Sequence, residues 1–521
     1  MSAITINRVH TRMRLPSQAL SERARLNRVV ADALDRFLET AIERHGISPH
    51  SYLCIRNLHA SVRLRLRQTE SQLAENFAET IANAVLEKHG AESSVHYSSR
   101  VHALIDLARN VMSARFGRTW AWAQLGLWRH EWSSSAASTA DHLLRVLASE
   151  PQYAVAVFAH VAPDQATIPM LLRWAAPQLW RELVAAACRT FGVASLGFIT
   201  SEPAPEFPSS LVTKFAARTV LRSQIAQSFS ADSTPRISDD LFTLFAVLVV
   251  LEFEPAVLRF AGAPARALLN YVATVLQRRA SDDRIAIDGS DSAPSVGELL
   301  SSEDIGAPGD RLVVSDRLRA DSASNPTTAA GRGSATLAAA AEEEAPPLDV
   351  RTVARTSLGG LVYLLNLVAR VDLPALINRD HRLTQRGLRW SLHQLAQLLV
   401  AGSSDDPAVL AFAGLLPRSV PPSSGEQPPA DTELAAIREY RGEIVLQLRK
   451  ALADRLELPN PSDAALLDFV CQRNAQVSGD PGWIEISFAL DDISTALRFA
   501  GLDLDPGWIP WLGVVVRFVY A

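Results

Sequence analysis

Apolar residues recur at helical spacing through most of this chain and alternate with polar residues only near its two ends. The spacing of three and four covers residues 26–42 and 73–85, several blocks between 101 and 279, and most of 358–456. Alternation occurs at residues 3–15, 53–67, 484–490 and 514–520. The pattern predicts a mainly α fold of the α+β class, with a strand-helix-strand unit at each end and a helical middle.

One phrase occurs twice in the last forty or so residues, as Asp480-Pro481-Gly482-Trp483 and as Asp505-Pro506-Gly507-Trp508. Asp bonds its own backbone, Pro presets φ at the second position and Gly accepts positive φ at the third, so each copy predicts a tight turn. We expect each turn to lead into a strand. Between them, Asp491 and Asp492 are expected to cap a short helix that ends at Gly501.

Composition changes abruptly at Ser281, where Ser, Asp, Gly, Ala and Pro replace most apolar residues. Such a segment cannot bury enough apolar surface to offset its ordering entropy, so a long flexible linker is predicted. The expected parts are an α+β unit (1–98), a Trp-rich helical domain (99–280), the linker (281–350), a helical domain (351–475) and a C-terminal βαβ unit (476–521). Because a two-stranded unit is marginal by itself, the β units at the two ends are also expected to share one sheet.

Two groups of residues indicate close packing or contact with partners. Trp120, Trp122 and Trp128 crowd one short stretch, and such clusters lie in a core or at an interface, of which we favour the core. Gly359 and Gly360 open an apolar helix and would let another element approach closely. Trp511, beside the second turn, joins these residues as a candidate for structural or interaction roles.

Arg63, Arg65 and Arg67 would point from one face of the second predicted strand. A solvated outer face of a one-sided sheet is the preferred interpretation. Contact with the acidic surface of a partner, or with phosphate, is the alternative.

Known catalytic motifs are missing: the sequence has no GxSxG, GxxxxGK or HExxH, and no GxGxxG after a strand. The cluster that most resembles a metal site is His45, His50, Cys54 and His59, but Cys54 and His59 would lie on opposite faces of one strand. The acidic pairs 405–406, 491–492 and 503/505 sit beside turns or helix starts, where Asp caps free amides. We therefore predict no catalytic, cofactor or metal residues.

Charge and cysteine content limit the partners and the cellular compartment expected for this chain. With 51 basic and 56 acidic residues in 521, the net charge of -5 gives no general attraction to nucleic acid. Three cysteines scattered singly suggest no disulfide framework. The longest apolar run, residues 241–251, is too short for a membrane span, and the first residues lack the apolar core of a signal peptide. A cytoplasmic protein without cofactors is expected.

Three stretches resemble one family: residues 500–521 (AGLDLDPGWIPWLGVVVRFVYA), 99–128 (SRVHALIDLARNVMSARFGRTWAWAQLGLW) and 356–367 (TSLGGLVYLLNL). They are similar to large bacterial proteins found with contractile injection systems, the phage-tail-like particles, which often carry a tape-measure-like label. The resemblance implies a non-enzymatic structural or assembly component whose partners are other particle subunits. A literal tape measure fits less well, since 29 prolines and 25 glycines break the long helix it would need.

Two other functions stay open. In the first, the chain is a scaffold unrelated to injection particles, with two folded halves that hold partners together and that fold separately. In the second, it is an enzyme with an unfamiliar site, which would require a deep pocket with convergent polar groups. A homo-oligomer is compatible with all three functions.

Overall fold

The computed structural model describes residues 4–6, 8–15, 21–45, 51–88, 93–129, 135–164, 167–193, 209–229, 238–260, 263–285, 351–383, 385–452, 461–492 and 494–520. The chain divides into two compact units, Met1–Asp283 with Pro346–Ala521, and Arg284–Ala345. All elements below belong to the first unit, except for the last two residues of α14. The predicted linker, 281–350, begins inside α14, and its residues 286–350 lie outside the described residues.

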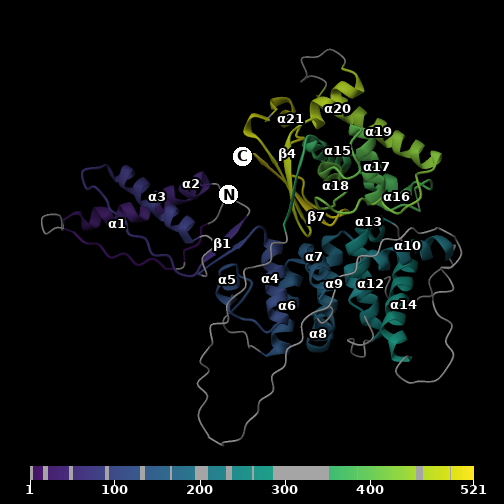
Figure 1. Cartoon of the computed structure of the whole chain (residues 1–521), viewed down its shortest axis with the longest axis horizontal. Coiled ribbons are helices and arrows are strands. Elements are labelled where there is room, and N and C mark those ends of the chain that lie inside the picture. Colours follow the sequence, from purple (N-terminus) through teal and green to yellow (C-terminus); the bar gives the residue numbers. More distant parts are fainter. Residues whose placement is uncertain are drawn as a thin grey trace, which may run out of the picture. The chain divides into compact units, whose positions relative to one another are not determined.

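The described part of the first hundred residues contains helices and a two-stranded antiparallel sheet, whose strands are separated in the chain by a helix (Figure 1). In chain order the elements are α1 (Arg23–Asp32), the π-helical turn η2 (Ala33–Phe37), α2 (Leu38–Arg44), β1 (Tyr52–Ile55), α3 (Glu70–Lys88) and β2 (Ser94–Tyr97). Val29, Ala33 and Leu38 pack against Leu73 and Ala78 of α3. The amphipathic spacing that predicted these helices therefore corresponds to a real buried face.

The first predicted strand is wrong, because none of residues 4–6 and 8–15 is in a strand. Ile4 and Ile6 occupy even positions whereas Val9, Met13 and Leu15 occupy odd ones, so these side chains could not share one face of a strand. The apolar residues at 4, 6 and 9 are exposed instead.

The second predicted strand, residues 53–67, is confirmed only at β1, which pairs antiparallel with β2. Beyond β1 the alternation persists without a sheet, and Arg63, Arg65 and Arg67 are exposed. The guanidinium of Arg25 donates to the carbonyls of Leu66 and Gln68, so the end of this stretch is held against α1.

Helices make up the described part of 99–285. They are α4 (Arg100–Met112), α5 (Thr119–Gln124), α6 (Ala136–Ser149), α7 (Pro151–Val161), α8 (Thr167–Trp174), α9 (Pro177–Thr190), α10 (Ser209–Arg222), α11 (Gln224–Gln227), α12 (Asp239–Phe253), α13 (Pro255–Phe260) and α14 (Ala263–Ile285). The run predicted as a buried helix at 241–251 is the centre of α12, which is buried almost all round. One apolar cluster joins these helices and also takes in Trp483 and Val515 from the C-terminal strands.

The C-terminal part combines helices with a five-stranded sheet. Its elements are β3 (Thr352–Thr356), the 3-10 helix η5 (Gly359–Leu364), α15 (Leu365–Arg370), α16 (Leu373–Arg379), α17 (Leu388–Val400), α18 (Pro407–Phe412), α19 (Asp431–Leu452), α20 (Asp463–Cys471), β4 (Ala475–Asp480), β5 (Trp483–Phe488), the 3-10 turn η6 (Leu490–Asp492), α21 (Thr495–Phe499), β6 (Gly507–Ile509) and β7 (Val514–Tyr520). The strand order is β3-β4-β5-β7-β6.

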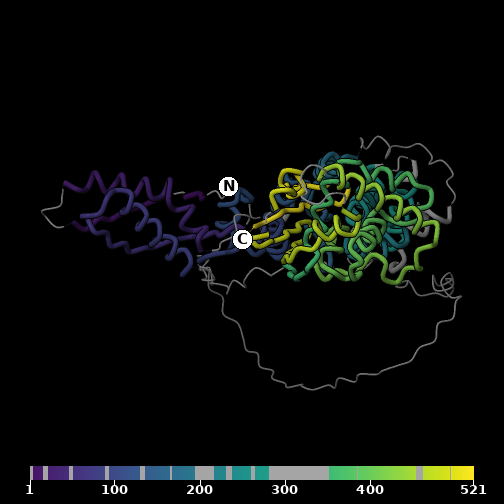
Figure 2. Tube along the Cα trace, turned by 90° about the horizontal axis from the view of Figure 1, so that it is seen from above, coloured from purple at the N-terminus to yellow at the C-terminus, as the bar shows by residue number. Residues whose placement is uncertain are grey.

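The predicted strand-helix-strand tail is confirmed, since β5 and β7 run parallel with α21 between them. Trp483 is in register with Val515, and Phe488 with Tyr520. The C-terminal strands (yellow) lie next to one another in Figure 1, and the same yellow part of the chain is seen from above in Figure 2. Gly501 has φ of 68° after α21, as its predicted stop requires.

Two details of the prediction differ from the structure. Asp491 and Asp492 belong to η6, and α21 begins only after Ser494, so the two acids do not cap it. The β units at the two ends form separate sheets, one of two strands and one of five. The C-terminal sheet needs no strand from the N-terminal unit because β3 and β4 extend it. β3 lies outside the predicted βαβ unit, and β4 lies at its boundary.

Candidate functional site

The first repeated phrase forms the turn of the β4–β5 hairpin. Asp480 and Trp483 are paired residues of the two strands, and Gly482 has the positive φ of 73° that the phrase predicts. The carbonyl of Gly482 accepts the backbone N–H of Val515 at 2.9 Å. The turn therefore also guides the last strand into place beside β5.

The second phrase does not form the predicted turn into the last strand. Asp505 and Pro506 precede the short edge strand β6, to which Gly507 and Trp508 already belong, and the turn that leads into β7 lies at residues 510–513. Gly507 has φ of 67°. The Asp505 carboxylate accepts the backbone N–H of Phe518 at 2.6 Å and lies 3.2 Å from the guanidinium of Arg517. β6 pairs with β7 only as far as Val516, so the N–H of Phe518 has no partner strand on that side. The Asp505 carboxylate accepts this N–H in place of a strand carbonyl. The two phrases lie on opposite sides of β7, rather than in one shared cleft.

The aromatic residues of the two phrases anchor the sheet to its surroundings. Trp508 donates from Nε1 to the carbonyl of Thr190 at 3.1 Å and meets the ring of Phe191 edge to face. Trp483 joins the core of the helical part, and Trp511 that of the C-terminal part. These three tryptophans are thus packing residues within the chain.

A buried polar cluster connects the first phrase to the start of α4. The Ser98 hydroxyl lies 3.1 Å from both carboxylate oxygens of Asp480 and 3.1 Å from Nδ1 of His102. Arg351 donates to the Ser98 carbonyl at 3.1 Å and to Glu485 at 2.8 Å. Burial raises the pKa of Glu485. The cluster brings together residues from β4, β5 and both sides of the described gap at 286–350.

Serine, histidine and aspartate together invite comparison with a catalytic triad, but their order is different. A triad places the imidazole between the other two groups, whereas here the Ser98 hydroxyl is in the middle. Nδ1 of His102 also accepts the backbone N–H of Ser98 at 3.2 Å, so Asp480 does not orient the ring through that atom. Asp480 is fully buried. This arrangement holds the turn against α4, and it lacks the geometry that activates a serine nucleophile.

The tryptophan cluster around residue 120 surrounds a buried carboxylate. Trp122 is 0% exposed and Trp128 is buried nearby, while Trp120 packs against the same cluster, which confirms the core interpretation. Nε1 of Trp122 donates to Asp106 at 3.0 Å. Asp106 also accepts from the side chains of Tyr97, Asn110 and Arg118. With its charge paired and its oxygens hydrogen-bonded, Asp106 organises the core.

The pair of glycines at 359 and 360 confirms the predicted close approach. A Cβ on Gly360 would lie 1.9 Å from the carbonyl oxygen of Val470 at the end of α20. One on Gly359 would lie 2.4 Å from Cβ of Ala475 in β4, and its own N–H donates to the carbonyl of Arg473 at 2.9 Å. Any side chain at these positions would push η5 away from α20 and β4.

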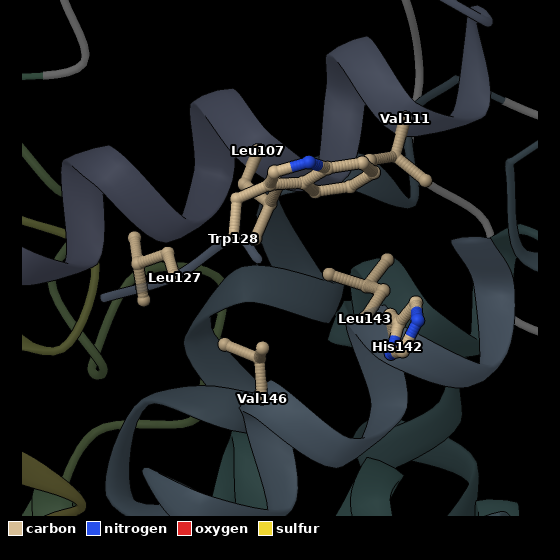
Figure 3. Close-up of a pocket in the computed structure, with 7 residues that line it drawn as sticks. All are labelled: Leu107, Val111, Leu127, Trp128, His142, Leu143 and Val146. Carbon is tan, nitrogen blue, oxygen red and sulfur yellow. The ribbon is translucent and has the colours of Figure 1, made fainter. Parts of the chain in front are cut away.

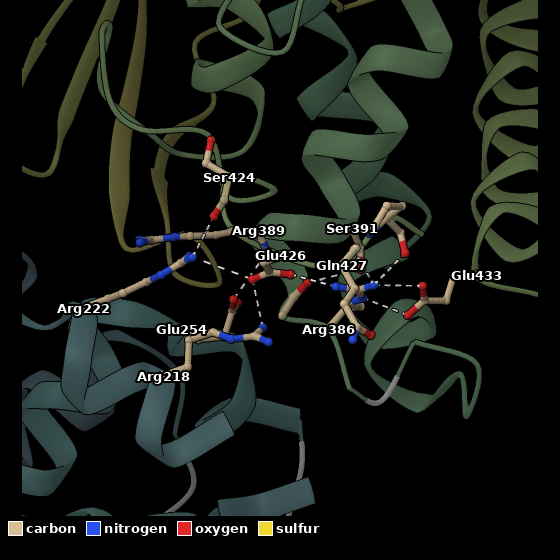
Figure 4. Close-up of polar contacts among 12 residues, drawn as sticks. Arg218, Arg222, Glu254, Arg386, Arg389, Ser391, Ser424, Glu426, Gln427 and Glu433 are labelled. Atoms are coloured by element: carbon tan, nitrogen blue, oxygen red, sulfur yellow. Dashed lines mark hydrogen bonds and ion pairs between the residues drawn. The ribbon is translucent and has the colours of Figure 1, made fainter. Parts of the chain in front are cut away.

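An ionic network joins α10 to the C-terminal helices (Figure 4). Glu426 lies 2.9 Å from Arg218 and 2.8 Å from Arg386, and its side chain is 5% exposed. Arg386 also contacts Glu433 at 2.8 Å and stacks over the ring of Trp390 at 4.5 Å. Paired and mostly buried charges of this kind fix the relative position of the helices that carry them.

A second carboxylate is buried close to this network, at the N-terminus of α17. Glu254 accepts the backbone N–H of Arg389 at 3.4 Å, and its Oε1 has no hydrogen-bond partner among the described residues. Arg389 in turn donates to the carbonyls of Glu252, at 3.2 Å, and of Leu512, at 2.7 Å. Burial raises the pKa of Glu254 to about 7. One arginine therefore connects α12, α17 and the turn between β6 and β7.

The pocket shown in Figure 3 encloses essentially no volume that a water molecule could occupy. Its lining is apolar apart from His142 and includes Trp128 between α4 and α6. Ligand sites usually enclose about 300–1,000 Å³ and present a few convergent polar groups. This pocket is a packing gap beside the tryptophan cluster.

Other chemistry has little support within the described residues. There, no group of three or more His, Cys, Asp or Glu side chains could hold a metal ion. His45 contacts Glu79 at 2.9 Å, and Cys54 donates to the carbonyl of Ala121; His50 is outside the described residues. Burial raises the pKa of the thiols of Cys54, Cys188 and Cys471 to about 12, so they stay protonated at neutral pH.

Membrane-spanning capacity is limited in the described part of the chain. No single helix there has both the length and the apolar composition required. Only the bent pair Gly359–Arg370 and Leu373–Arg379, with 71° between its members, meets the requirement jointly. The apolar side chains of this pair belong to the buried C-terminal cluster.

Comparisons with known protein families, with curated proteins and with solved structures found no match for this chain.

Sequence reasoning missed most of the buried polar residues: Ser98, His102, Asp106, Arg118, Glu254, Arg351, Arg389 and Glu426. Several of their partners lie far away in the chain, as with Ser98 and Asp480, so spacing carries no signal for those pairs. Others are nearer, as with Asp106 and Arg118, but no motif identifies them. One local signal was available. Ser99 precedes an apolar helical run and accepts the N–H of His102, which identifies the start of α4.

Proposed function

We propose that this chain is a non-enzymatic structural or assembly component of a phage-tail-like contractile injection particle, acting through contacts with other proteins. The observation that carries the proposal is that the three stretches on which the family resemblance rests meet inside one fold. The hydroxyls of Tyr363 and Tyr520 are 2.9 Å apart, and Asn366 donates to the carbonyls of Leu502 and Leu504. These contacts join stretch 356–367 to stretch 500–521.

Stretch 99–128 meets the same C-terminal region through core contacts. Its buried side chains belong to the cluster that contains Val515. Ser98, immediately before the stretch, binds Asp480 of the first repeated phrase. Residues shared with a family in this way would maintain a fold, which supports a role in assembly over one in catalysis.

Within that class, an adaptor or assembly factor is better supported than a length-measuring protein. The longest described helix, α14, has 23 residues, or about 35 Å at 1.5 Å per residue. The scaffold of two separately folding halves is less well supported, because hydrogen bonds join the two parts. Trp508 donates to the carbonyl of Thr190 in α9, and Arg389 donates to that of Glu252 in α12. Assembly in the cytoplasm follows from the same proposal.

The test is affinity purification of the tagged chain from its native host, with mass spectrometry of the proteins that co-purify. Recovery of sheath, tube or baseplate subunits would support the proposal, and their ratios to the chain would separate a stoichiometric component from an assembly factor. The same tag on an unrelated protein of similar abundance is the control. Recovery of the chain alone, or with metabolic enzymes, would overturn the proposal.

A further inference from the structure

Two segments of the described chain expose large apolar side chains to water. The first is residues 4–15, called here the N-terminal segment, in which Ile4, Ile6 and Val9 are 40 to 49% exposed. The second is residues 489–513, called the crossover, which connects β5 to β7 and in which Leu490, Phe499 and Leu504 are 59 to 72% exposed. Clusters of exposed apolar side chains within short segments mark interaction surfaces more often than isolated ones do.

The two segments carry opposite charge. The N-terminal segment contains Arg8, Arg12 and Arg14 and no acidic residue, for a formal net charge of +3. The crossover contains four aspartates and one arginine, for a net charge of -3. Among the aspartates, Asp491 and Asp505 are exposed, and Asp505 also lies 3.2 Å from Arg517 of β7. Complementary charge around apolar contacts guides association and selects the partner.

We propose that the N-terminal segment of one copy docks on the crossover of a second copy of this chain. Within a single chain both segments remain exposed, so they do not cover each other. A symmetric pair would make the contact twice, because each copy offers one segment and one crossover. This proposal does not depend on the injection-particle assignment.

Two alternatives would give different behaviour. Arg63, Arg65 and Arg67 are a second exposed basic triplet, also in an extended segment. General attraction between basic and acidic surfaces would involve both triplets equally, whereas docking of the N-terminal segment involves only the first. Val420, 76% exposed in another loop, provides an apolar side chain outside both segments.

The experiment measures the mass of the full purified chain by sedimentation velocity between about 1 and 100 µM, a range that covers typical weak to moderate dimers. We expect a dimer whose dissociation constant rises with salt, since exposed charges are screened. F499S/L504S and I4S/I6S should each weaken the dimer about tenfold or more, as loss of two buried side chains predicts. R8S/R12S/R14S should weaken it, while R63S/R65S/R67S and V420S should not.

Mixing the two variants tests directly whether the segment of one copy binds the crossover of the other. F499S/L504S and I4S/I6S should each be mainly monomeric alone, but an equimolar mixture retains one intact contact per pair and should recover dimer. Circular dichroism of each variant confirms that it is folded. A wild-type monomer throughout the range, unchanged dimerisation in the variants, equal effects of the two arginine triplets, or no recovery on mixing would overturn the proposal.

Discussion

Gly360→Ala would place a methyl group against the backbone of α20. The added Cβ would lie 1.9 Å from the carbonyl oxygen of Val470, where ordinary contacts begin at 3.4 Å. The separation therefore has to grow by roughly 1.5 Å, the difference between these distances. The obstacle is a main-chain atom, so rotation of a side chain cannot relieve it.

The expected loss of stability follows from this geometry. Overpacking a core with one methyl group typically costs about 1–3 kcal/mol. We expect the upper end, about 3 kcal/mol, because η5 or α20 must move as a unit and both belong to the buried C-terminal cluster. Against a total stability of about 5–15 kcal/mol, such a loss is easily measured.

The assay is urea unfolding followed by far-UV circular dichroism, with Gly442→Ala as the matched control. Gly442 lies in α19 with no atom near its would-be Cβ. Alanine there should raise stability by about 0.5–1 kcal/mol, as expected for an exposed helical glycine. A Gly360→Ala midpoint at or above that of the wild type, or equal losses for both variants, would show that the close approach does not limit this position.

Further variants test the buried polar groups. D106N removes a buried charge from its arginine partner and should destabilise by about 3–5 kcal/mol in urea unfolding. The control E439Q, in an exposed ion pair, should cost far less. S98A should cost about 1–2 kcal/mol, and a double-mutant cycle with D480N should show coupling of about 1 kcal/mol; additive effects would refute their interaction. Burial raises the pKa of Glu254 to about 7 from 4.5, so the folded state holds a proton that the unfolded state releases, and stability falls as pH rises through this window. E254Q should therefore gain stability relative to the wild type between roughly pH 5 and pH 7, measured by unfolding at each pH; a constant difference would contradict this.

The parts of the fold that the sequence predicted well are those specified by neighbouring residues. The turn at Gly482 follows from the Asp-Pro-Gly order, and the parallel arrangement of β5 and β7 follows from a strand, a helix and a strand in close succession. Gly360 could be recognised because an apolar helical run rarely contains adjacent glycines without a packing reason.

Predictions failed where the outcome depended on distant parts of the chain. β2 is only four residues long, Ser94 to Tyr97, and is a strand because β1 lies beside it. The alternation at 61–67 has the appearance of a strand, but the stretch belongs to no sheet, and Arg25 of α1 donates to the carbonyls of Leu66 and Gln68. The polar cluster at Ser98 was missed because two of its members, Arg351 and Asp480, lie more than 200 residues away in the sequence.

The position of β7 inside its sheet sets the timing of folding during synthesis. β3 must wait for β4, made more than a hundred residues later, and one edge of β5 stays open until β7 has been made. At about 5–20 residues per second, the ribosome needs roughly 8 to 35 s to proceed from β3 to the end of β7. For that interval the nascent chain presents unpaired strand edges, the surfaces through which neighbouring chains on a polysome aggregate. Protection by a chaperone is therefore most valuable between the synthesis of residue 352 and that of residue 520.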